Sequence, residues 1–217
     1  MHDDDVPIGR LLSRREALAV LSTGSAALLL GCGPNAVDST PGTAASSPES
    51  GISCVVKPEE TEGPFFGSSN LNRADLRLAT SSGVASAGVP LAHTVGVSSV
   101  GRAACTPLEG AIVNVWQCDA RGAYSGFRSE GTEGADFLRG FQRTDASGQA
   151  SFLTVYPGWY RGRAVHVHLK VRTSDDDDAY EFTSQLYFPD AVSAGVFAQP
   201  AYARSDTQRV TNTREGV

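Results

Sequence analysis

The amino-acid sequence predicts an all-β domain, an antiparallel β-sandwich in which long functional loops join the strands. Short apolar segments rich in Val, Phe and Leu recur along residues 52–217, and clusters of Gly, Pro, Asp or Ser separate them. Long helical periodicity is absent after residue 52, so helices are not expected to build the body of the domain. A barrel with similar loops is the alternative that this pattern leaves open.

Five segments are predicted to be strands. They are, in chain order, residues 94–100, 111–117, 150–155, 164–171 and 182–188. A hairpin-type turn, DASG at 145–148, directly precedes the third segment, in which Phe152 and Thr154 alternate with Ser151 and Leu153. Alternation with a period of two residues is typical of a strand that buries one face.

The first 32 residues are predicted to be an export signal of the twin-arginine/lipoprotein type. Arg14 and Arg15 precede a mostly apolar stretch of 14 residues at 17–30, which has the length of a signal h-region. An ordinary membrane-spanning helix would be longer. The stretch ends in LLGC at 29–32, which resembles a bacterial lipobox, so we expect an exported, extracytoplasmic protein attached to the membrane only through a lipid on Cys32. An ordinary cleaved signal and a short retained anchor are the alternatives.

Residues 33–51 are predicted to be a disordered linker that tethers a single domain at 52–217. They consist mainly of Ser, Thr, Pro, Ala and Gly, and this composition cannot bury enough apolar surface to order itself. Beyond Cys32 the chain has 15 basic and 20 acidic residues, a net charge of −5. No basic stripe is present that could neutralise phosphates, so nucleic acid is not an expected partner.

Three cysteines remain in the exported part, Cys54, Cys105 and Cys118. In an oxidising compartment, two of them are expected to pair and one to stay buried and free. Because Cys105 and Cys118 are expected at opposite ends of one extended segment, a bridge that includes Cys54 is favoured. The sequence does not choose its partner.

The segment RAVHVH at 163–168 is the most informative one for function. Alternate side chains of a strand point to the same face, so His166 and His168 lie on one face, about 7 Å apart along the backbone. Two imidazoles at this spacing can bind one metal ion, whereas a histidine satisfied by hydrogen bonds in the core is the alternative. The opposite face is aliphatic throughout: Val165, Val167, Leu169 and Val171. It is expected to pack on the core, which leaves the histidines facing a cleft.

A metal site on this strand needs oxygen ligands from elsewhere in the chain. His93 is the only other histidine after residue 52, and neither an HExxH helix nor a paired-Cys zinc motif is present. Tyr160 ends the segment YPGWY at 156–160, where Pro and Gly predict a turn back over the histidines. Tyr124 follows the turn after the second predicted strand. Phenolate is a hard ligand that favours Fe(III), so a site formed by Tyr124, Tyr160, His166 and His168 is expected to be ferric.

Eight motifs carry a resemblance to a known family. They are TEGPFF (61–66), VWQCDA (115–120), GAY (122–124), LRG (138–140), TDASG (144–148), YPGWY (156–160), RAVHVH (163–168) and QLYF (185–188). In this order and spacing they resemble the intradiol ring-cleavage dioxygenases, which include protocatechuate 3,4-dioxygenase and catechol 1,2-dioxygenase. The resemblance covers most of residues 55–190 and is closest to the small exported members. It implies a β-sandwich with long active-site loops that uses O₂ to cleave a catechol-type ring between its two hydroxylated carbons, giving a muconate-type diacid.

The resemblance also implies a role for each matched residue. Tyr124, Tyr160, His166 and His168 would hold one mononuclear non-haem Fe(III). The catechol displaces Tyr160, whose phenolate then takes a substrate proton. Gln185 matches a glutamine that lies near the iron behind its ligands, and is the predicted cofactor-binding residue outside the ligand set.

Arg163 matches a catalytic arginine that lies beside the substrate and stabilises negative charge on it. An unpaired guanidinium on the apolar face of the strand would be costly. We therefore expect the strand to begin after Arg163, which then lies in the preceding loop. A surface ion pair with one of the many acids is the alternative for this side chain.

The chain departs from the larger family members in two places. Only Arg161 and Gly162 separate Tyr160 from Arg163, where the large catabolic enzymes have a longer loop. The helical N-terminal dimerisation region of the catechol dioxygenases has no counterpart. The particular catechol and the oligomeric state therefore do not follow from the resemblance.

Two other functions fit parts of the sequence. A sandwich of transthyretin type would be a non-enzymatic binding module tethered outside the cytoplasm, with Tyr and His as packing residues. A copper or other redox protein could use the His-x-His strand, although a blue-copper site uses Cys and Met ligands and Met1 is the only methionine. The acidic run at 175–178 is predicted to be a solvated turn rather than a Ca²⁺ site, because no Gly-spaced ligand pattern surrounds it.

Overall fold

The computed structural model describes residues 57–67, 70–100, 104–176, 178–204 and 208–215. The predicted signal segment, the predicted linker and the predicted start of the domain at residue 52 lie outside the described residues. Within the described ranges, no helix combines the length and the apolar character that crossing a membrane requires.

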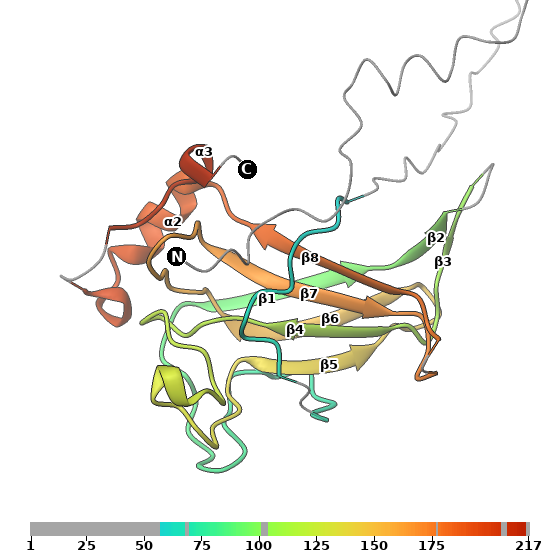
Figure 1. Cartoon of the computed structure of the whole chain (residues 1–217), viewed down its shortest axis with the longest axis horizontal. Coiled ribbons are helices and arrows are strands. Elements are labelled where there is room, and N and C mark those ends of the chain that lie inside the picture. Colours follow the sequence, from blue (N-terminus) through green and yellow to red (C-terminus); the bar gives the residue numbers. More distant parts are fainter. Residues whose placement is uncertain (1–56, 68–69, 101–103, 177, 205–207, 216–217) are drawn as a thin grey trace, which may run out of the picture. The chain divides into compact units, whose positions relative to one another are not determined.

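The described part of the chain forms eight strands in three antiparallel sheets (Figure 1). The largest sheet has the order β5-β4-β7-β8, with β5 at Arg139–Arg143, β4 at Ile112–Trp116, β7 at His166–Arg172 and β8 at Glu181–Tyr187. A second sheet pairs β1 (Pro90–Gly96) with β6 (Gln149–Val155), and a short third one pairs β2 (Ser98–Val100) with β3 (Cys105–Pro107). The predicted all-β sandwich is confirmed.

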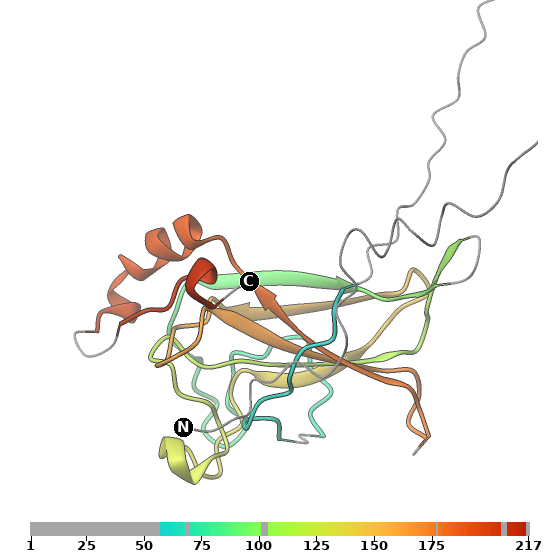
Figure 2. The ribbon, with the colours of Figure 1, turned by 45° about the horizontal axis from the view of Figure 1, so that its top comes forward.

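The core lies between the four-stranded sheet and the β1-β6 sheet (Figure 2). Val95 and Phe152 contribute from the two-stranded sheet, and Val113, Val167 and Leu169 contribute from the four-stranded one. On β7 the inward side chains alternate with the two histidines, because successive residues of a strand point to opposite faces. Val167, Leu169 and Val171 of the predicted apolar face therefore pack in this core, whereas Val165 precedes β7 and packs in a second buried cluster.

Four of the five predicted strands are found with ends shifted by at most two residues. The predicted strand at 94–100 is different, because β1 begins at Pro90 and the chain breaks its pairing at Val97 before β2. There the Val97 N–H donates to the Gly148 carbonyl, and its carbonyl accepts from the Leu108 N–H. Neither β3 nor β5 was predicted, and the sequence of β5, RGFQR, lacks the apolar alternation of a strand.

The turn at 145–148 is formed, but it is not a hairpin within one sheet. Asp145 Oδ1 accepts from the backbone N–H groups of Ser147 and Gln149, and Gly148 has the positive φ of 74° that completes the turn. The strands on either side, β5 and β6, belong to different sheets. The turn therefore carries the chain from one layer of the sandwich to the other.

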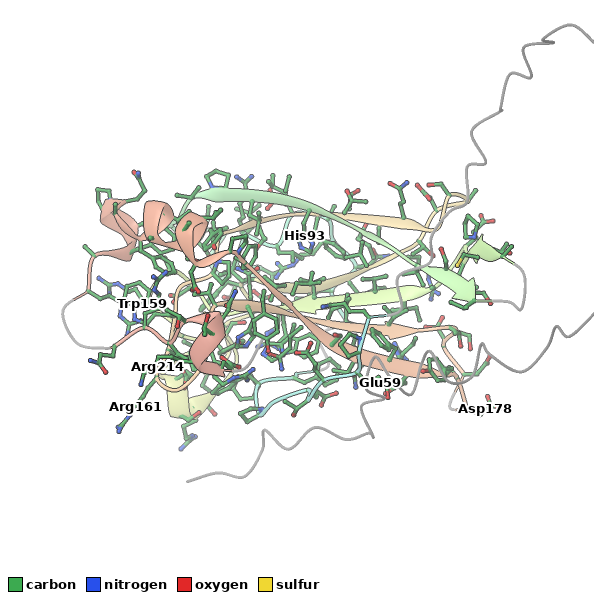
Figure 3. All side chains as sticks on the ribbon, turned by 90° about the horizontal axis from the view of Figure 1, so that it is seen from above. Glu59, His93, Trp159, Arg161, Asp178 and Arg214 are labelled. Atoms are coloured by element: carbon green, nitrogen blue, oxygen red, sulfur yellow. The ribbon has the colours of Figure 1, made fainter. Side chains whose placement is uncertain are left out.

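Short helices gather at the end of the sandwich where β8 ends (Figure 1). They are η1 (Arg128–Glu130), α2 (Asp190–Phe197), η2 (Pro200–Tyr202) and α3 (Asn212–Glu215). Three residues of the acidic run, Asp175, Asp176 and Asp178, are exposed in the connection between β7 and β8 at the opposite end, where Asp178 is labelled in Figure 3. Asp175 forms an ion pair with Arg143 there.

Two cysteines are described. Cys105 is in a disulfide bond, whereas Cys118 is free and buried. The disulfide therefore does not join these two residues. The favoured partner Cys54 lies outside the described residues, so the bridge to it stays a prediction.

Candidate metal centre

Both histidines belong to β7, one of the two inner strands of the four-stranded sheet. His168 pairs with Trp116 on one side and with Gln185 on the other, and the exposed fractions of His166 and His168 are 2% and 1%. Their Nε2 atoms are 3.1 Å apart. As the two-residue spacing predicts, the two imidazoles lie on the same face of the strand and their Nε2 atoms converge.

Two tyrosines bring their hydroxyl groups to the same place. Tyr124 Oη lies 3.1 Å from His168 Nε2 and 3.5 Å from His166 Nε2. Tyr160 Oη lies 3.0 Å from His166 Nε2. The structure thus brings together all four residues that the sequence analysis proposed as metal ligands.

Close backbone contact between two loops sets the tyrosines side by side. A Cβ atom at Gly122 would lie 2.3 Å from the Trp159 carbonyl oxygen, and one at Gly158 would lie 2.5 Å from the Ala120 carbonyl oxygen. Gly122 also has a φ of 86°, which favours glycine. These glycines allow the loop before Tyr124 to touch the loop before Tyr160.

Aromatic rings cover the four donor atoms. Phe65 stacks on Tyr124 at a centroid distance of 4.4 Å, and Trp116 stacks on His168 at 4.8 Å. Gly63 has a φ of 70° and lies so close to the His168 ring that a Cβ there would be 3.2 Å from Cε1. The segment 61–66, to which no role was assigned from the sequence, therefore packs against Tyr124 and His168 of the site.

The spacing of the four atoms fits a single metal ion. Imidazole and oxygen ligands lie about 2.0 to 2.2 Å from a first-row divalent ion, so neighbouring ligands at angles of 90° to 109° are about 2.9 to 3.5 Å apart. Four of the six distances between the donor atoms are known, and they lie in this range at 3.0 to 3.5 Å. Among the described residues, no group of three or more His, Cys, Asp or Glu side chains is placed to hold a metal, so a site here depends on the phenols.

Burial keeps all four groups uncharged in the absence of a cation. It lowers the pKa of His166 to about 3, with help from the nearby positive charge of Arg163, and it lowers the pKa of His168 well below its ordinary value. Burial also raises the pKa values of Tyr124 and Tyr160. Each imidazole is therefore neutral near neutral pH, with a proton on one nitrogen and a lone pair on the other, and the phenols ionise only if a cation compensates their charge.

A backbone carbonyl fixes the orientation of the first histidine. His166 Nδ1 lies 2.7 Å from the Ala164 carbonyl oxygen, to which only a protonated nitrogen can donate. The lone pair of Nε2 then points at the two phenols. This arrangement is typical of histidines that bind metals.

Arg163 lies in the loop before β7, as predicted, since the strand begins at His166. Its side chain is only 12% exposed, so it is not a surface arginine, although its Nε does pair with a carboxylate, that of Glu215, at 2.6 Å. Its Nη2 donates to Gln185 Oε1 at 2.6 Å. Gln185 is fully buried and donates from Nε2 to the Thr61 carbonyl, so it links Arg163 to the segment that covers the site.

Sequence reasoning missed two charged residues near the centre. Arg139 is 5% exposed and donates to Ser125 Oγ at 2.8 Å and to the Ser125 carbonyl at 2.5 Å, directly beside Tyr124. Glu215 reaches Arg163 from α3. Arg139 belongs to the quoted LRG motif, which could have marked it, whereas no local signal marks Glu215.

The fold and the site together define a β-sandwich with a candidate mononuclear metal centre on one face of its larger sheet. A family model described as "Dioxygenase" matches residues 61–202, most of the chain. The intradiol ring-cleavage dioxygenase from Tetranychus urticae is 28% identical, with a TM-score of 0.64 over 74% of this chain and 78% of that one.

A second solved structure is the dioxygenase domain of a dioxygenase and carbohydrate-binding protein fusion from Streptomyces sp. SirexAA-E. It is 32% identical over 70% of this chain and 90% of that one, with a TM-score of 0.45. No curated protein matches the chain. The chain belongs to the intradiol ring-cleavage dioxygenases, a family of oxidoreductases that act on catechol-type rings.

Proposed function

We propose that this protein is a non-haem Fe(III) dioxygenase that uses O₂ to cleave a catechol-type ring between its two hydroxylated carbons, giving a muconate-type diacid. The observation that carries the proposal is the convergence of two phenol oxygens and two imidazole nitrogens within 3.0 to 3.5 Å, in a chain of this family. Phenolate donors favour Fe(III) over softer or divalent ions.

Tyr124, Tyr160, His166 and His168 would hold the iron. When bound, ferric iron supplies a centre that holds a catechol through its oxygens and draws electron density from the ring. The chain's own residues differ in their freedom to move. Tyr124 is fully buried under Phe65, whereas Tyr160 is partly exposed. Tyr160 is therefore the phenol that yields its place to the substrate.

Tyr160 Oη also accepts a proton from the substrate in this proposal. Burial raises the pKa of its phenol, so its phenolate is a strong base once it is free. Arg163 acts electrostatically: its charge lies near enough to Tyr160 to oppose the rise in that pKa. The same charge stabilises a negatively charged substrate beside it.

The two competing functions of the sequence analysis lose their support. A non-enzymatic carrier would use tyrosine and histidine as packing residues, and would have no reason to aim four polar atoms at one buried point. A blue-copper site would place a cysteine and a methionine among its ligands. The cluster contains two phenols instead.

We further propose export by the twin-arginine route and attachment to the membrane through a lipid on Cys32, from the sequence pattern at 14–32 alone. Fractionation of cells that express the full chain tests this proposal. The wild type should be extracytoplasmic and membrane-bound, and Cys32→Ala should leave the membrane fraction. A Cys32→Ala protein that stays membrane-bound contradicts the lipid anchor.

Metal analysis and the visible spectrum of the purified protein test the proposed activity. We expect one iron per chain and a red-brown tyrosinate-to-iron band that shifts when catechol is added without oxygen. Admitting O₂ should then convert the catechol to the ring-opened diacid, which mass spectrometry detects. A colourless protein that takes up no Fe(III) contradicts the proposal.

A further inference from the structure

The short helix α3 reaches the candidate centre through one side chain, Glu215. Its carboxylate lies beside the loop that precedes β7, with Oε1 2.6 Å from Arg163 Nε and Oε2 in contact with the Ala164 N–H. Figure 3 shows Arg214 of α3 at the same end of the molecule as Arg161 of that loop. Glu215 is 51 and 52 residues away from its two partners in the sequence, so tertiary packing alone makes these contacts.

The segment before Glu215 is fixed by contacts to the junction between β8 and α2. Asn212 donates from Nδ2 to the Phe188 carbonyl at 2.9 Å, and its backbone N–H donates to Asp190 Oδ2 at 3.2 Å. The guanidinium of Arg209 lies over the Phe197 ring, 5.4 Å from its centroid. These contacts fix the helix in a position from which Glu215, its last residue, reaches Arg163.

The carboxylate of Glu215 holds two groups that matter for the site. One oxygen accepts a hydrogen bond from the Arg163 Nε–H, while Gln185 Oε1 accepts one from Nη2 of the same guanidinium. A planar guanidinium held on two sides has a fixed orientation. The other oxygen binds the peptide N–H of Ala164, the residue whose carbonyl orients His166.

The pair is shielded from water, which gives it more weight than a surface ion pair. The side chains of Arg163 and Glu215 are 12% and 14% exposed. By contrast, the Arg128–Glu133 pair has exposed fractions of 86% and 65%. Charged contacts gain strength as the surrounding dielectric falls, and exposed pairs contribute little.

We propose that Glu215 is a positioning residue for ring cleavage, which fixes the Arg163 guanidinium beside the substrate. The proposal rests on the proposed function. It adds that α3 contributes to the active site through Glu215, which is 52 residues downstream of Arg163. Glu215 acts through Arg163 and does not touch the reacting atoms.

The activity test is a double-mutant cycle on iron-loaded protein. Glu215→Gln should keep iron and the visible band and lower kcat/KM about 10-fold or more, because a misplaced catalytic group costs up to about 100-fold. In an Arg163→Ala background, the same substitution should have little further effect. The matched control is Glu181→Gln, since Glu181 on β8 pairs with Lys170 away from the centre and should leave kcat/KM unchanged.

A second readout uses metal-free protein and needs no activity. Glu215→Gln should lower Tm by about 2 to 4 °C, the shift that loss of one buried charged contact produces in a domain of this size, and should lower it less when Arg163 is already Ala. This cycle reports whether the contact exists in solution. Glu133→Gln, which affects an exposed pair, should leave Tm within about 1 °C.

The outcomes separate the two proposals. An active wild type whose kcat/KM is unchanged by Glu215→Gln overturns the positioning role and leaves the proposed function intact. An equal loss in the Arg163→Ala background also overturns it, because Glu215 then acts by another route. An iron-free, inactive wild type that still shows coupling in Tm overturns the proposed function, and with it any catalytic meaning of this contact.

Discussion

The two faces of β7 belong to one strand and are similarly buried, yet they have different roles. On one face Val167, Leu169 and Val171 are 1% to 8% exposed and pack in the core. On the other, His166 and His168 are 1% to 2% exposed and meet two phenols. Burial alone therefore does not distinguish a core from a site.

The difference lies in where the polar atoms point. Apolar side chains gain free energy simply by leaving water, so the core face stabilises the fold in proportion to its buried area. Buried polar groups cost free energy unless they are paired, and the other face brings four of them to one point. A bound cation would interact with these four groups in place of water and so stabilise the cluster. Mutations on the site face should therefore affect metal binding, and mutations on the core face should affect stability.

The largest expected effect comes from removing a donor from the site face. His166→Ala should lose the metal and with it all detectable ring cleavage, while the far-UV circular dichroism stays that of the wild type, because Val167 still packs in the core. His93→Ala is the matched control: His93 stacks on Phe152 in the other sheet and should be dispensable for metal binding. Metal analysis checks both variants. An active, iron-loaded His166→Ala protein would falsify the ligand assignment.

A milder change on the same face should separate metal binding from turnover. Tyr160→Phe removes only the hydroxyl group, so three donors remain and iron should stay bound, whereas kcat should fall about 100-fold because the proton acceptor is lost. Metal content and steady-state kinetics give the two quantities. Tyr180→Phe, at an exposed tyrosine, is the control. Unchanged turnover in Tyr160→Phe would show that another group takes the proton.

Both faces of β7 could be predicted because they depend only on the local sequence of one strand. Alternation with a period of two is a property of any strand, so the two-residue spacing of His166 and His168 is enough to place them on a common face. Tyr124 and Tyr160 required more. Their approach depends on close backbone contacts at Gly122 and Gly158. The sequence predicted the turn before Tyr160 but not these contacts between the two loops.

The features that sequence analysis missed depend on long-range packing. Strand β5 is an edge strand whose Arg139 turns inward to hold Ser125, so its composition looks like that of a loop. Glu215 meets Arg163 across 52 residues, and the helix that carries it, NTRE, has no apolar pattern to mark it. The covering role of Phe65 likewise appears only when the segment 61–66 lies on the sheet.

The converse change on the core face should leave the chemistry intact. Val167→Ala removes two buried methyl groups at a 1% exposed position, and should lower the free energy of unfolding by about 2 kcal/mol. The visible band and kcat should be unchanged below the unfolding transition. Val192→Ala, at a half-exposed valine of α2, should change stability by less than about 0.5 kcal/mol. Urea unfolding measures both. A large loss of kcat in folded Val167→Ala would mean that the faces are coupled.

The last expected effect is a dependence of stability on pH, to which only the site face contributes on β7. His166 stays neutral in the fold, since its pKa is lowered to about 3, but it binds a proton near pH 6.5 when unfolded. The unfolded state therefore takes up more protons as the pH falls from about 6.5 towards 3, and stability is lost across that window. Each such histidine contributes about 1.4 kcal/mol per pH unit. His168, whose pKa is also lowered, adds to the slope.

Urea midpoints of metal-free protein between about pH 6 and pH 4.5 give this slope, which should be shallower in His166→Gln by the share of one histidine. An equal slope in the two proteins would mean that His166 is already protonated in the metal-free fold. That result would contradict the conclusion that its imidazole is neutral and able to bind a metal.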